Sequence, residues 1–267
     1  MFFDSHVHSE VSPDSDMCPE LAIKLLQKKN LGVTFTEHVD FATPASEGVD
    51  YNATDVPYGV YEFVCDLKRY PSDYKRRIRS NHALLGIEVG LSAAYLSRNT
   101  EVAGGGFDFV LGSIHRVEGK EIYYDFPNEC GDYISRYLTY MQKMVELCGF
   151  FDSLAHIDYI ARYDQDVANA FSYKNYASHF DAVFKTLIET DRVIEINTSR
   201  LGDNKLIQKL VPIYTRFVQL GGRYCTIGSD AHLPESVGRN FDKALWLAGE
   251  SGMKVVYYKD RKRYLCD

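Results

Sequence analysis

Histidines and carboxylates recur along this chain at the ends of short apolar stretches. Seven of these stretches end in Asp4-x-His6-x-His8, Thr36-Glu37-His38, Gly86-x-Glu88, Gly112-Ser113-x-His115, Ala155-His156-x-Asp158, Glu195-x-Asn197 and Gly228-Ser229-Asp230-x-His232. Imidazoles and carboxylates gathered without cysteine suit borderline divalent metals such as Zn, Mn or Fe(II). The pattern therefore indicates a metal centre.

Any single histidine of this kind can also be a buried or surface side chain without a metal, because histidine is intermediate in burial. Six of the eight histidines, however, end predicted strands. In a strand, His-x-His directs both rings to one face, where they can chelate one ion. Glu88 and Asp230 each end an apolar run, where an unpaired carboxylate would be costly. His82, at a strand start, and His179, in a helical run, are expected to lie outside the site.

The elements that must position these side chains alternate in type along the chain. Apolar runs predict strands at 1–8, 32–38, 83–90, 107–115, 151–158, 192–197, 224–230 and 254–259. Segments of helical period predict helices at 19–30, 91–99, 134–148, 176–190, 205–221 and 234–252. This alternation predicts an α/β fold with a parallel sheet, and seven or eight units favour a closed barrel over an open sheet. Parallel barrels build their active sites at the C-terminal ends of the strands, so the candidate ligands would converge there.

Glycines and prolines mark several boundaries. Left-handed caps at the C-terminal ends of helices are predicted at Gly32, Gly149, Gly221, Gly222 and Gly252. Pro19 and Pro234 stand at predicted helix starts, where a missing N–H costs little. Residues 39–60 and 116–130 form long connections after strands, and we predict that they cover the substrate.

Composition limits the class of protein. The 267 residues are 45% hydrophobic, without a repeat or linker, which predicts one globular domain over 1–267. The net charge of −7 provides no electrostatic footprint for DNA or RNA. The six cysteines form no Cys-x-x-Cys pair, which fits a reducing cytoplasm. No apolar run approaches 18 residues and no secretion signal is present, so we expect neither export nor a membrane anchor.

In order along the chain, the motifs resemble those of the polymerase and histidinol phosphatase (PHP) family. The resemblance rests on Asp4-x-His6-x-His8, Thr36-Glu37-His38, Gly86-x-Glu88, Gly112-Ser113-x-His115, Ala155-His156-x-Asp158 and Gly228-Ser229-Asp230-x-His232. Each motif alone has little specificity, whereas the ordered set is highly specific. The resemblance implies a distorted (β/α)7 barrel with a metal site at the C-terminal ends of its strands. In length the chain is similar to the stand-alone histidinol-phosphate phosphatases of the family.

The resemblance also implies two or three divalent ions per chain (Zn, Mn or Fe). It assigns one ion to His6, His8, Glu88 and Asp230, a second to Glu88, His115 and His156, and a third to His38, His232 and a residue of the loop after His8. Many family members have a histidine in that loop, where this chain has Asp14. Asp16 is an alternative third ligand. Oxygen in place of nitrogen there would shift the preference toward Mn or Fe.

The activity that the resemblance implies is hydrolysis of L-histidinol phosphate to L-histidinol and inorganic phosphate, in histidine biosynthesis. Two metals can deprotonate a bridging water, hold the phosphoryl oxygens and stabilise in-line displacement. We therefore expect a bridging hydroxide to attack phosphorus directly, with Glu88 as the bridging ligand. The acid for the leaving alkoxide is expected to be Asp230, His232 or a metal-bound water.

Substrate contacts are expected from side chains that follow strand ends. Arginine forks bind phosphate oxygens in a bidentate manner, and Arg162, Arg200 and Arg116 are the candidates. Asn197 and Ser199 are expected to donate hydrogen bonds to the substrate. Candidates for contacts with the amine and imidazole of the substrate are Glu37, Asp40, Phe41, Tyr58, Tyr61, Asp158 and Tyr159.

Three alternatives remain open. A PHP phosphoesterase could act on a nucleotide, a phosphotyrosine peptide or a DNA 3′ end, although the acidic balance weighs against nucleic acid. Metal-dependent amidohydrolases also begin with His-x-His on a barrel strand, but they often use a carboxylated lysine where this chain has Glu88. The third alternative is a metal-binding regulator without catalysis. The sequence does not determine the oligomeric state.

Overall fold

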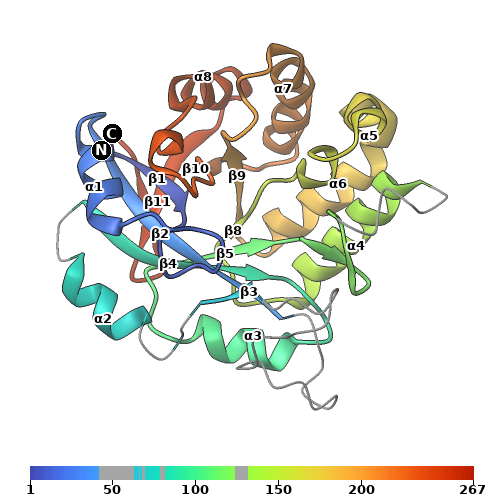
Figure 1. The fold of residues 1–267 in the computed structure, drawn as a ribbon. Coiled ribbons are helices and arrows are strands. Elements are labelled where there is room, and N and C mark those ends of the chain that lie inside the picture. Colours follow the sequence, from blue (N-terminus) through green and yellow to red (C-terminus); the bar gives the residue numbers. More distant parts are fainter. Residues whose placement is uncertain (42–62, 66, 68–69, 79–81, 124–131) are drawn as a thin grey trace.

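The computed structural model describes the chain except for residues 42–62, 66, 68–69, 79–81 and 124–131. Most of the predicted loop 39–60 and the second half of the loop 116–130 lie outside the described residues, as do Tyr58 and Tyr61. Strands occupy the centre of the molecule, and helices surround them (Figure 1).

Seven parallel strands form a barrel in the described part of the chain. In order of pairing they are β1 (Phe2–Val7), β2 (Leu31–Asp40), β4 (Ala83–Gly90), β5 (Phe109–Ser113), β8 (Ser153–Leu154), β9 (Val193–Asn197) and β10 (Tyr224–Gly228). The barrel closes where the chain after β10 returns to the end of β1. There Asp230 N–H donates to His6 O at 2.7 Å, and His8 N–H donates to Ala231 O at 2.9 Å. The predicted α/β barrel is confirmed.

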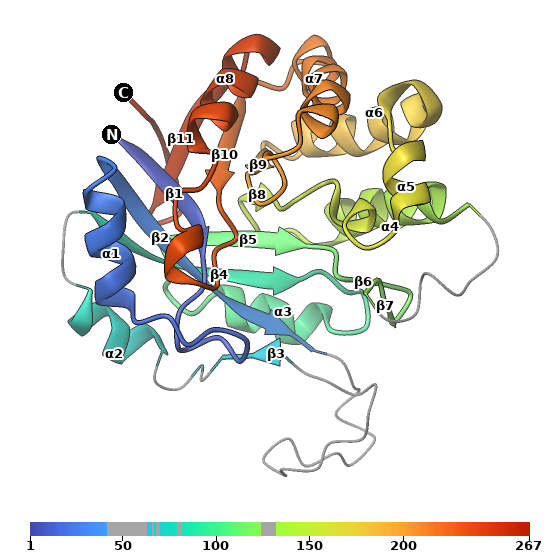
Figure 2. The same ribbon diagram turned by 45° about the horizontal axis from the view of Figure 1, so that its top comes forward.

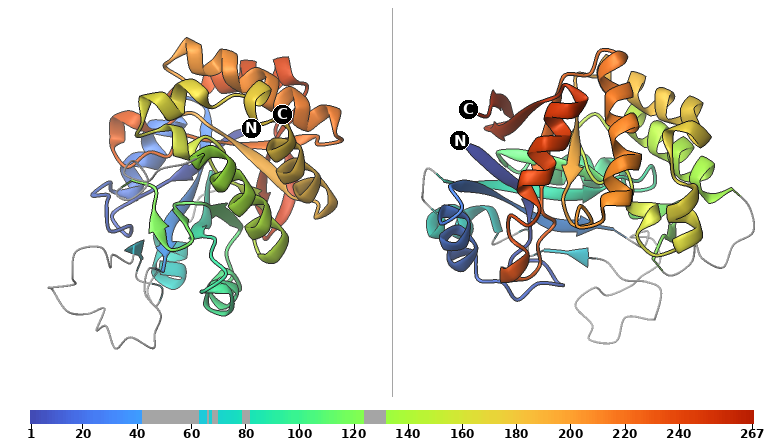
Figure 3. Two further views of the ribbon diagram at one scale, coloured as in Figure 1. Left: turned by 90° about the vertical axis from the view of Figure 1, so that its right-hand side faces the viewer. Right: turned by 90° about the horizontal axis from the view of Figure 1, so that it is seen from above.

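Helices cover the outside of this barrel (Figures 1 and 3). Those in the described residues are α1 (Pro19–Gln27), α2 (Tyr70–Arg77), α3 (Leu96–Ala103), α4 (Tyr133–Leu147), α5 (Gln165–Ala170), α6 (Tyr173–Glu189), α7 (Asn204–Gln219) and α8 (Phe241–Ser251). Each longer helix buries one stripe; in α7, Leu206, Leu210, Ile213 and Phe217 recur every three or four residues and are buried. No helix in the described part of the chain combines the length and the hydropathy needed to cross a membrane.

Short elements follow the C-terminal ends of several strands. They are β3 (Phe63–Val64), β6 (Arg116–Val117), β7 (Lys120–Glu121), and the 3-10 turns η3 (Tyr159–Ala161) and η4 (Pro234–Ser236). Figure 2 shows the β6–β7 hairpin beyond the arrowheads of β4 and β5. These elements therefore border the face of the barrel where the candidate ligands end their strands.

A C-terminal hairpin closes the opposite end of the barrel. It consists of β11 (Lys254–Lys259) and β12 (Lys262–Leu265), and β11 pairs with the beginning of β10. Val256 and Tyr258 of β11 pack against Phe109, Leu111 and Val193 in an apolar cluster. On β5 and β9 these residues alternate with residues that pack in the larger core, so the cluster lies inside the barrel. The hairpin thus supplies the floor beneath the candidate site.

Arg261, in the turn of this hairpin, fastens it to the barrel. Its guanidinium donates to the Asp152 carboxylate at 2.7 and 3.1 Å and to Phe150 O at 2.5 Å. Hydrogen bonds to charged groups typically contribute about 1.5–3 kcal/mol, and about a third of this side chain is exposed. We expect Arg261→Ala to lower the free energy of unfolding by about 1–2 kcal/mol, measured by urea denaturation.

The matched control is Arg223→Ala, because Arg223 is exposed. It should change the free energy of unfolding by less than about 0.5 kcal/mol. Equal losses in the two variants would contradict a fastening role for Arg261.

Some predicted boundaries are wrong. Left-handed conformations occur at Gly221 and Gly252 but not at Gly32, Gly149 and Gly222. Gly32 lies inside β2, and Asn30 takes the left-handed position before it, with φ 57°. A Cβ on Gly32 would approach the Phe3 ring to 2.5 Å, so close packing rather than backbone conformation requires glycine there.

The predicted helix 234–252 is also too long. Pro234 begins the turn η4, and α8 starts only at Phe241. Between them, Gly238 N–H donates to Asp4 Oδ2 at 2.8 Å, and the Arg239 guanidinium donates to Ser229 O at 3.1 Å. These bonds hold the segment against the loop after β10 in place of a first helical turn. The helix predicted from 91 likewise begins later, at Leu96.

Candidate metal centre

All nine predicted ligands converge at the C-terminal face of the barrel. They are His6 and His8 at the end of β1, Asp14 in the loop after it, His38 on β2, Glu88 on β4, His115 after β5, His156 after β8, and Asp230 and His232 after β10. Their ligand atoms fall into three groups, which we call nests A, B and C. Tetrahedral zinc with bonds of about 2.0–2.2 Å requires donor atoms about 3.3–3.6 Å apart, so the separations test each nest.

Nest A consists of His6 Nε2, His8 Nε2, Glu88 Oε2 and Asp230 Oδ1. His6 Nε2 lies 3.3 Å from Glu88 Oε2 and 3.5 Å from Asp230 Oδ1. His8 Nε2 lies 3.6 Å from both oxygens. In the described residues, His6 Nε2, His8 Nε2 and Glu88 Oε2 are buried without a hydrogen bond, and Glu88 Oε2 also lies 3.0 Å from His38 Nδ1. Such atoms are costly to bury, and a shared cation would satisfy them together.

Nest B consists of Glu88 Oε1 and the Nε2 atoms of His115 and His156. The carboxylate oxygen lies 3.4 Å from His115 and 3.1 Å from His156, and the two nitrogens lie 3.4 Å apart. Because the other oxygen of Glu88 faces nest A, one carboxylate joins both nests. The bridging position predicted for Glu88 agrees with this geometry.

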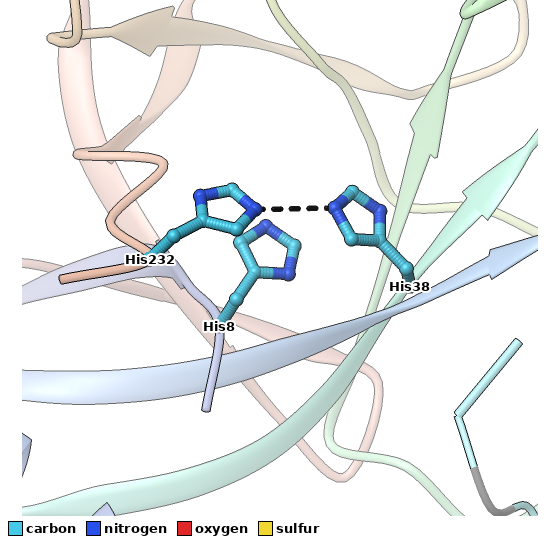
Figure 4. A group of neighbouring side chains, drawn as sticks. All are labelled: His8, His38 and His232. Atoms are coloured by element: carbon cyan, nitrogen blue, oxygen red, sulfur yellow. Dashed lines mark hydrogen bonds between the residues drawn. The ribbon is translucent and has the colours of Figure 1, made fainter. Parts of the chain in front are cut away.

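Nest C consists of Asp14 Oδ2 and the Nε2 atoms of His38 and His232. Asp14 Oδ2 lies 3.3 Å from His38 and 3.1 Å from His232, and the nitrogens lie 3.3 Å apart. Figure 4 shows His38 and His232 facing each other, with the His8 ring lying alongside both. The ring centroid of His8 lies 4.1 Å from that of His38 and 4.2 Å from that of His232. Asp14 therefore approaches both imidazoles, whereas Asp16 is exposed.

The carboxylates of the centre are held in their charged form. Burial acts to raise the pKa of Glu88, but the positive charges of His6, His38 and His115 outweigh it and hold the pKa well below its usual value. For Asp230, burial is outweighed in the same way by His6 and Arg162. The buried carboxylates are therefore stabilised by positive charge at this place, which divalent ions would supply in place of protons on the histidines.

Outer partners orient three of the imidazoles. His6 Nδ1 lies 2.7 Å from Glu195 Oε1, His115 Nδ1 lies 3.0 Å from Asp40 Oδ2, and His8 Nδ1 lies 3.3 Å from Ser12 Oγ. Such contacts fix the ring orientation and direct Nε2 to the nests. The sequence interpretation did not assign this role to Glu195. The sequence pattern that could have indicated it is its position in β9, two residues before Asn197 and on the same strand face.

Asp230 has an uncommon backbone conformation, with φ 54° in the left-handed region. Its N–H donates to His6 O, and its carbonyl oxygen lies 3.2 Å from His232 Nδ1 and accepts from the Arg239 guanidinium at 3.4 Å. This conformation directs the carboxylate into nest A. Strain of this kind persists where surrounding contacts determine it, often at functional sites.

The predicted phosphate ligands occupy different surroundings. Arg162 is largely buried, and its Nη1 donates to Asp230 Oδ2 at 2.8 Å. Its Nε and Nη2 have no hydrogen-bond partner in the described residues. Arg200 pairs with Asp158 at 3.3 Å, and Arg116 pairs with Glu121 at 2.8 Å.

A pocket opens beside these groups. Its walls are Asp14, His38, Asp40, His115, Arg116, Glu121, Tyr123, Tyr159, Arg162, Tyr163, Asp230 and His232. Of the predicted contacts for the substrate amine and imidazole, Asp40 and Tyr159 line this pocket. Glu37 is fully buried and binds Ser9 and Ser12 instead. Phe41 is buried beneath the Arg98 guanidinium.

Asn197 is engaged with its neighbours in the protein. Its Nδ2 donates to Glu195 Oε2 at 3.2 Å and to Asp230 Oδ2 at 3.4 Å. Its Oδ1 accepts from the main-chain N–H and the hydroxyl of Ser199. These contacts favour a role in positioning Asp230 over the predicted hydrogen bond to substrate.

A parallel barrel whose strands end in buried histidine and carboxylate nests has the architecture of a metal-dependent hydrolase. A family model described as "PHP domain" matches residues 4–199. A "Probable histidinol-phosphatase" of Clostridium acetobutylicum is 38% identical over 267 residues, which cover 98% of each chain. The chain therefore belongs to the PHP domain family.

Relatives from Lactococcus lactis subsp. lactis agree with this assignment. Its "Histidinol-phosphatase" is 26% identical over 257 residues, covering 93% of this chain and 91% of the relative. A crystal structure of histidinol phosphate phosphatase (HISK) from L. lactis, complexed with Zn, L-histidinol and phosphate, superposes with a TM-score of 0.82 at 24% identity, covering 98% of both chains. The barrel fold is thus shared over nearly the whole length.

Proposed function

We infer that the protein is a metal-dependent histidinol-phosphatase of histidine biosynthesis, which hydrolyses L-histidinol phosphate to L-histidinol and inorganic phosphate. Its near full-length relatives of the PHP family support this reaction. The observation that carries the inference is the set of three nests, whose ligand atoms lie 3.1–3.6 Å apart, within about 0.2 Å of the separations that a shared tetrahedral ion requires.

We propose three divalent ions per chain, one in each nest, with Asp14 rather than Asp16 as the third ligand of nest C. Support comes from the 3.1–3.3 Å separations around Asp14 Oδ2. Zn is a suitable ion, since the L. lactis structure contains it. When bound, such ions would neutralise the phosphate dianion and lower the pKa of a water molecule. The family model matches residues 4–199, but nest A also needs Asp230 and nest C also needs His232. We therefore propose that residues 1–267 act as one domain.

Arg162 is proposed as the main phosphate ligand among the side chains. Its Nη1 is fixed by Asp230, and Nε and Nη2 remain to bind phosphoryl oxygens in the pocket. Arg116 would form part of the wall, and Arg200 would contribute less because Asp158 already binds it. Asp230 faces both nest A and Arg162, and His232 offers Nε2 to nest C while its Nδ1 faces Asp230 O, so a water held at the centre is the remaining candidate for the acid.

The leaving alcohol is proposed to lie along the tyrosine wall of the pocket. Tyr159 lies against the His115 and His156 rings, and Tyr163 and Tyr123 continue the wall outward. Tyr123 and Tyr163 are half-exposed, with Glu121 beside them in the pocket lining. Aromatic faces and a carboxylate suit the imidazole and amine of the substrate. We also propose a cytoplasmic setting, since the five described cysteines are free.

Metal analysis combined with kinetics tests the function. We expect three ions per chain by inductively coupled plasma mass spectrometry, and two would show that one nest stays empty. Dialysis against a chelator should lower kcat/KM for L-histidinol phosphate more than about 100-fold. Loss of one hydrogen-bond partner of a metal ligand typically costs about 10- to 100-fold, and loss of the ions themselves should cost more. Added Zn, Mn or Fe(II) should restore it.

A substrate panel gives the control. If the loaded enzyme hydrolyses a nucleoside monophosphate or an aryl phosphate as fast as L-histidinol phosphate, the assigned substrate is wrong. If chelation leaves activity unchanged, metal dependence is wrong.

A further inference from the structure

Glu37 is a buried carboxylate that belongs to none of the three nests. It lies on β2 next to His38, but successive side chains of a strand point to opposite faces, so it is directed away from the pocket. Its oxygens accept from Ser9 N–H at 3.0 Å, Ser9 Oγ at 2.5 Å and Ser12 Oγ at 2.7 Å. All three donors belong to the loop that carries Asp14.

The direction of these hydrogen bonds determines what Ser12 can do next. A carboxylate only accepts, so the Ser12 hydroxyl proton points to Glu37. The Ser12 oxygen must then accept from its other partners, which are His38 N–H at 3.0 Å and His8 Nδ1 at 3.3 Å. This places the His8 proton on Nδ1 and leaves the Nε2 lone pair for nest A.

The same contacts fix the loop between β1 and α1. Ser12 N–H donates to Ser9 O at 2.9 Å, and Ser15 N–H donates to Ser12 O at 3.3 Å. The Ser15 hydroxyl in turn donates to His232 O at 2.9 Å. Asp14 lies between two anchored serines, so its carboxylate is held against nest C.

We propose that Glu37 is a positioning residue for metal binding, which acts through Ser12 on His8 in nest A and on Asp14 in nest C. Glu37 contacts no substrate. The inference rests on the assignment of the nests as metal sites. According to this proposal, replacing the Glu37 carboxylate weakens metal binding although every candidate metal ligand is still present.

Glu37→Gln is the informative variant, because it keeps the volume and offers an NH₂ group that cannot accept from a serine. Chelator-stripped protein is titrated with Zn²⁺ by calorimetry. We expect Zn²⁺ affinity for part of the sites to fall about 10- to 100-fold, the usual effect of losing an outer partner. The Zn²⁺ concentration for half-maximal activity should rise by a similar factor, and excess Zn²⁺ should restore kcat. A role confined to folding would instead unfold the metal-free variant, because Zn²⁺ also rescues an unstable fold by mass action, and circular dichroism of the stripped protein detects this.

Two further variants complete the design. Ser12→Ala should weaken Zn²⁺ binding similarly, and combining it with Glu37→Gln should add little, because both act through one hydrogen-bond chain. Tyr74→Phe is the matched control: its hydroxyl contacts Ser9 Oγ at the far side of the cluster, so Zn²⁺ affinity should stay within about threefold of the parent.

The inference is overturned if folded Glu37→Gln binds Zn²⁺ with parental affinity. If that variant does not fold, Ser12→Ala decides: parental affinity overturns the inference, and weakened, Zn²⁺-rescued binding supports it. Failure of the proposed function would appear separately, as a parent protein that binds no Zn²⁺ or does not hydrolyse L-histidinol phosphate.

Discussion

Replacement of Glu88 by glutamine is expected to lower kcat/KM for L-histidinol phosphate by more than about 100-fold. Loss of an outer partner typically costs 10- to 100-fold, and Glu88 contributes one oxygen to nest A and the other to nest B. Glutamine keeps the volume but replaces one of the two oxygens with an NH₂ group. Kinetics and metal content per chain measure the effect, with circular dichroism to verify the fold.

Glu118→Gln is the control for this experiment, since Glu118 makes an exposed ion pair with Arg136. It should retain parental activity and metal content. A folded Glu88→Gln enzyme with activity within about tenfold of the parent would refute the bridging role.

Replacement of Arg162 by methionine should lower kcat/KM by about 100- to 1,000-fold, as loss of one preorganised donor to a developing charge does elsewhere. Arg200→Met should cost less, because its guanidinium pairs with Asp158. Inhibition by inorganic phosphate provides the second measurement and should weaken mainly in Arg162→Met. Arg162→Lys separates charge from geometry: lysine can pair with Asp230 but lacks the fork.

Equal losses in the Arg162 and Arg200 variants would show that both side chains bind phosphate equally. Unchanged phosphate inhibition in Arg162→Met would place the phosphate elsewhere in the pocket.

The clustering of the candidate ligands could be predicted from sequence because a parallel barrel converts a repeated local position into a spatial cluster. His6, His38 and Glu88 lie near the ends of their strands, and the seven barrel strands all end at one face. The period of two in a strand also predicted that His6 and His8 share a face. The fold class and the candidate metal centre followed from these regularities.

The hydrogen bonds that orient the candidate ligands could not be predicted, because they join residues far apart in sequence that no motif or periodicity relates. Glu195 reaches His6 across 189 positions of sequence. Glu37 was predicted to contact the substrate. It lies on the same strand as His38 but points to the opposite face, away from the pocket. The left-handed backbone of Asp230 depends on bonds from Arg239 and to His6, which only the closed barrel brings together.

The closure of the barrel has a kinetic consequence. The bonds that join the end of β1 to the chain after β10 run through His6, His8 and Asp230, which are also members of nest A. Transient breaking of these hydrogen bonds would therefore move His6 and His8 away from Asp230 at the same time as it separates β1 from the chain after β10. An ion in nest A, as proposed, would then leave when the barrel opens locally, so its residence time would report how often the hydrogen bonds between β1 and the chain after β10 break.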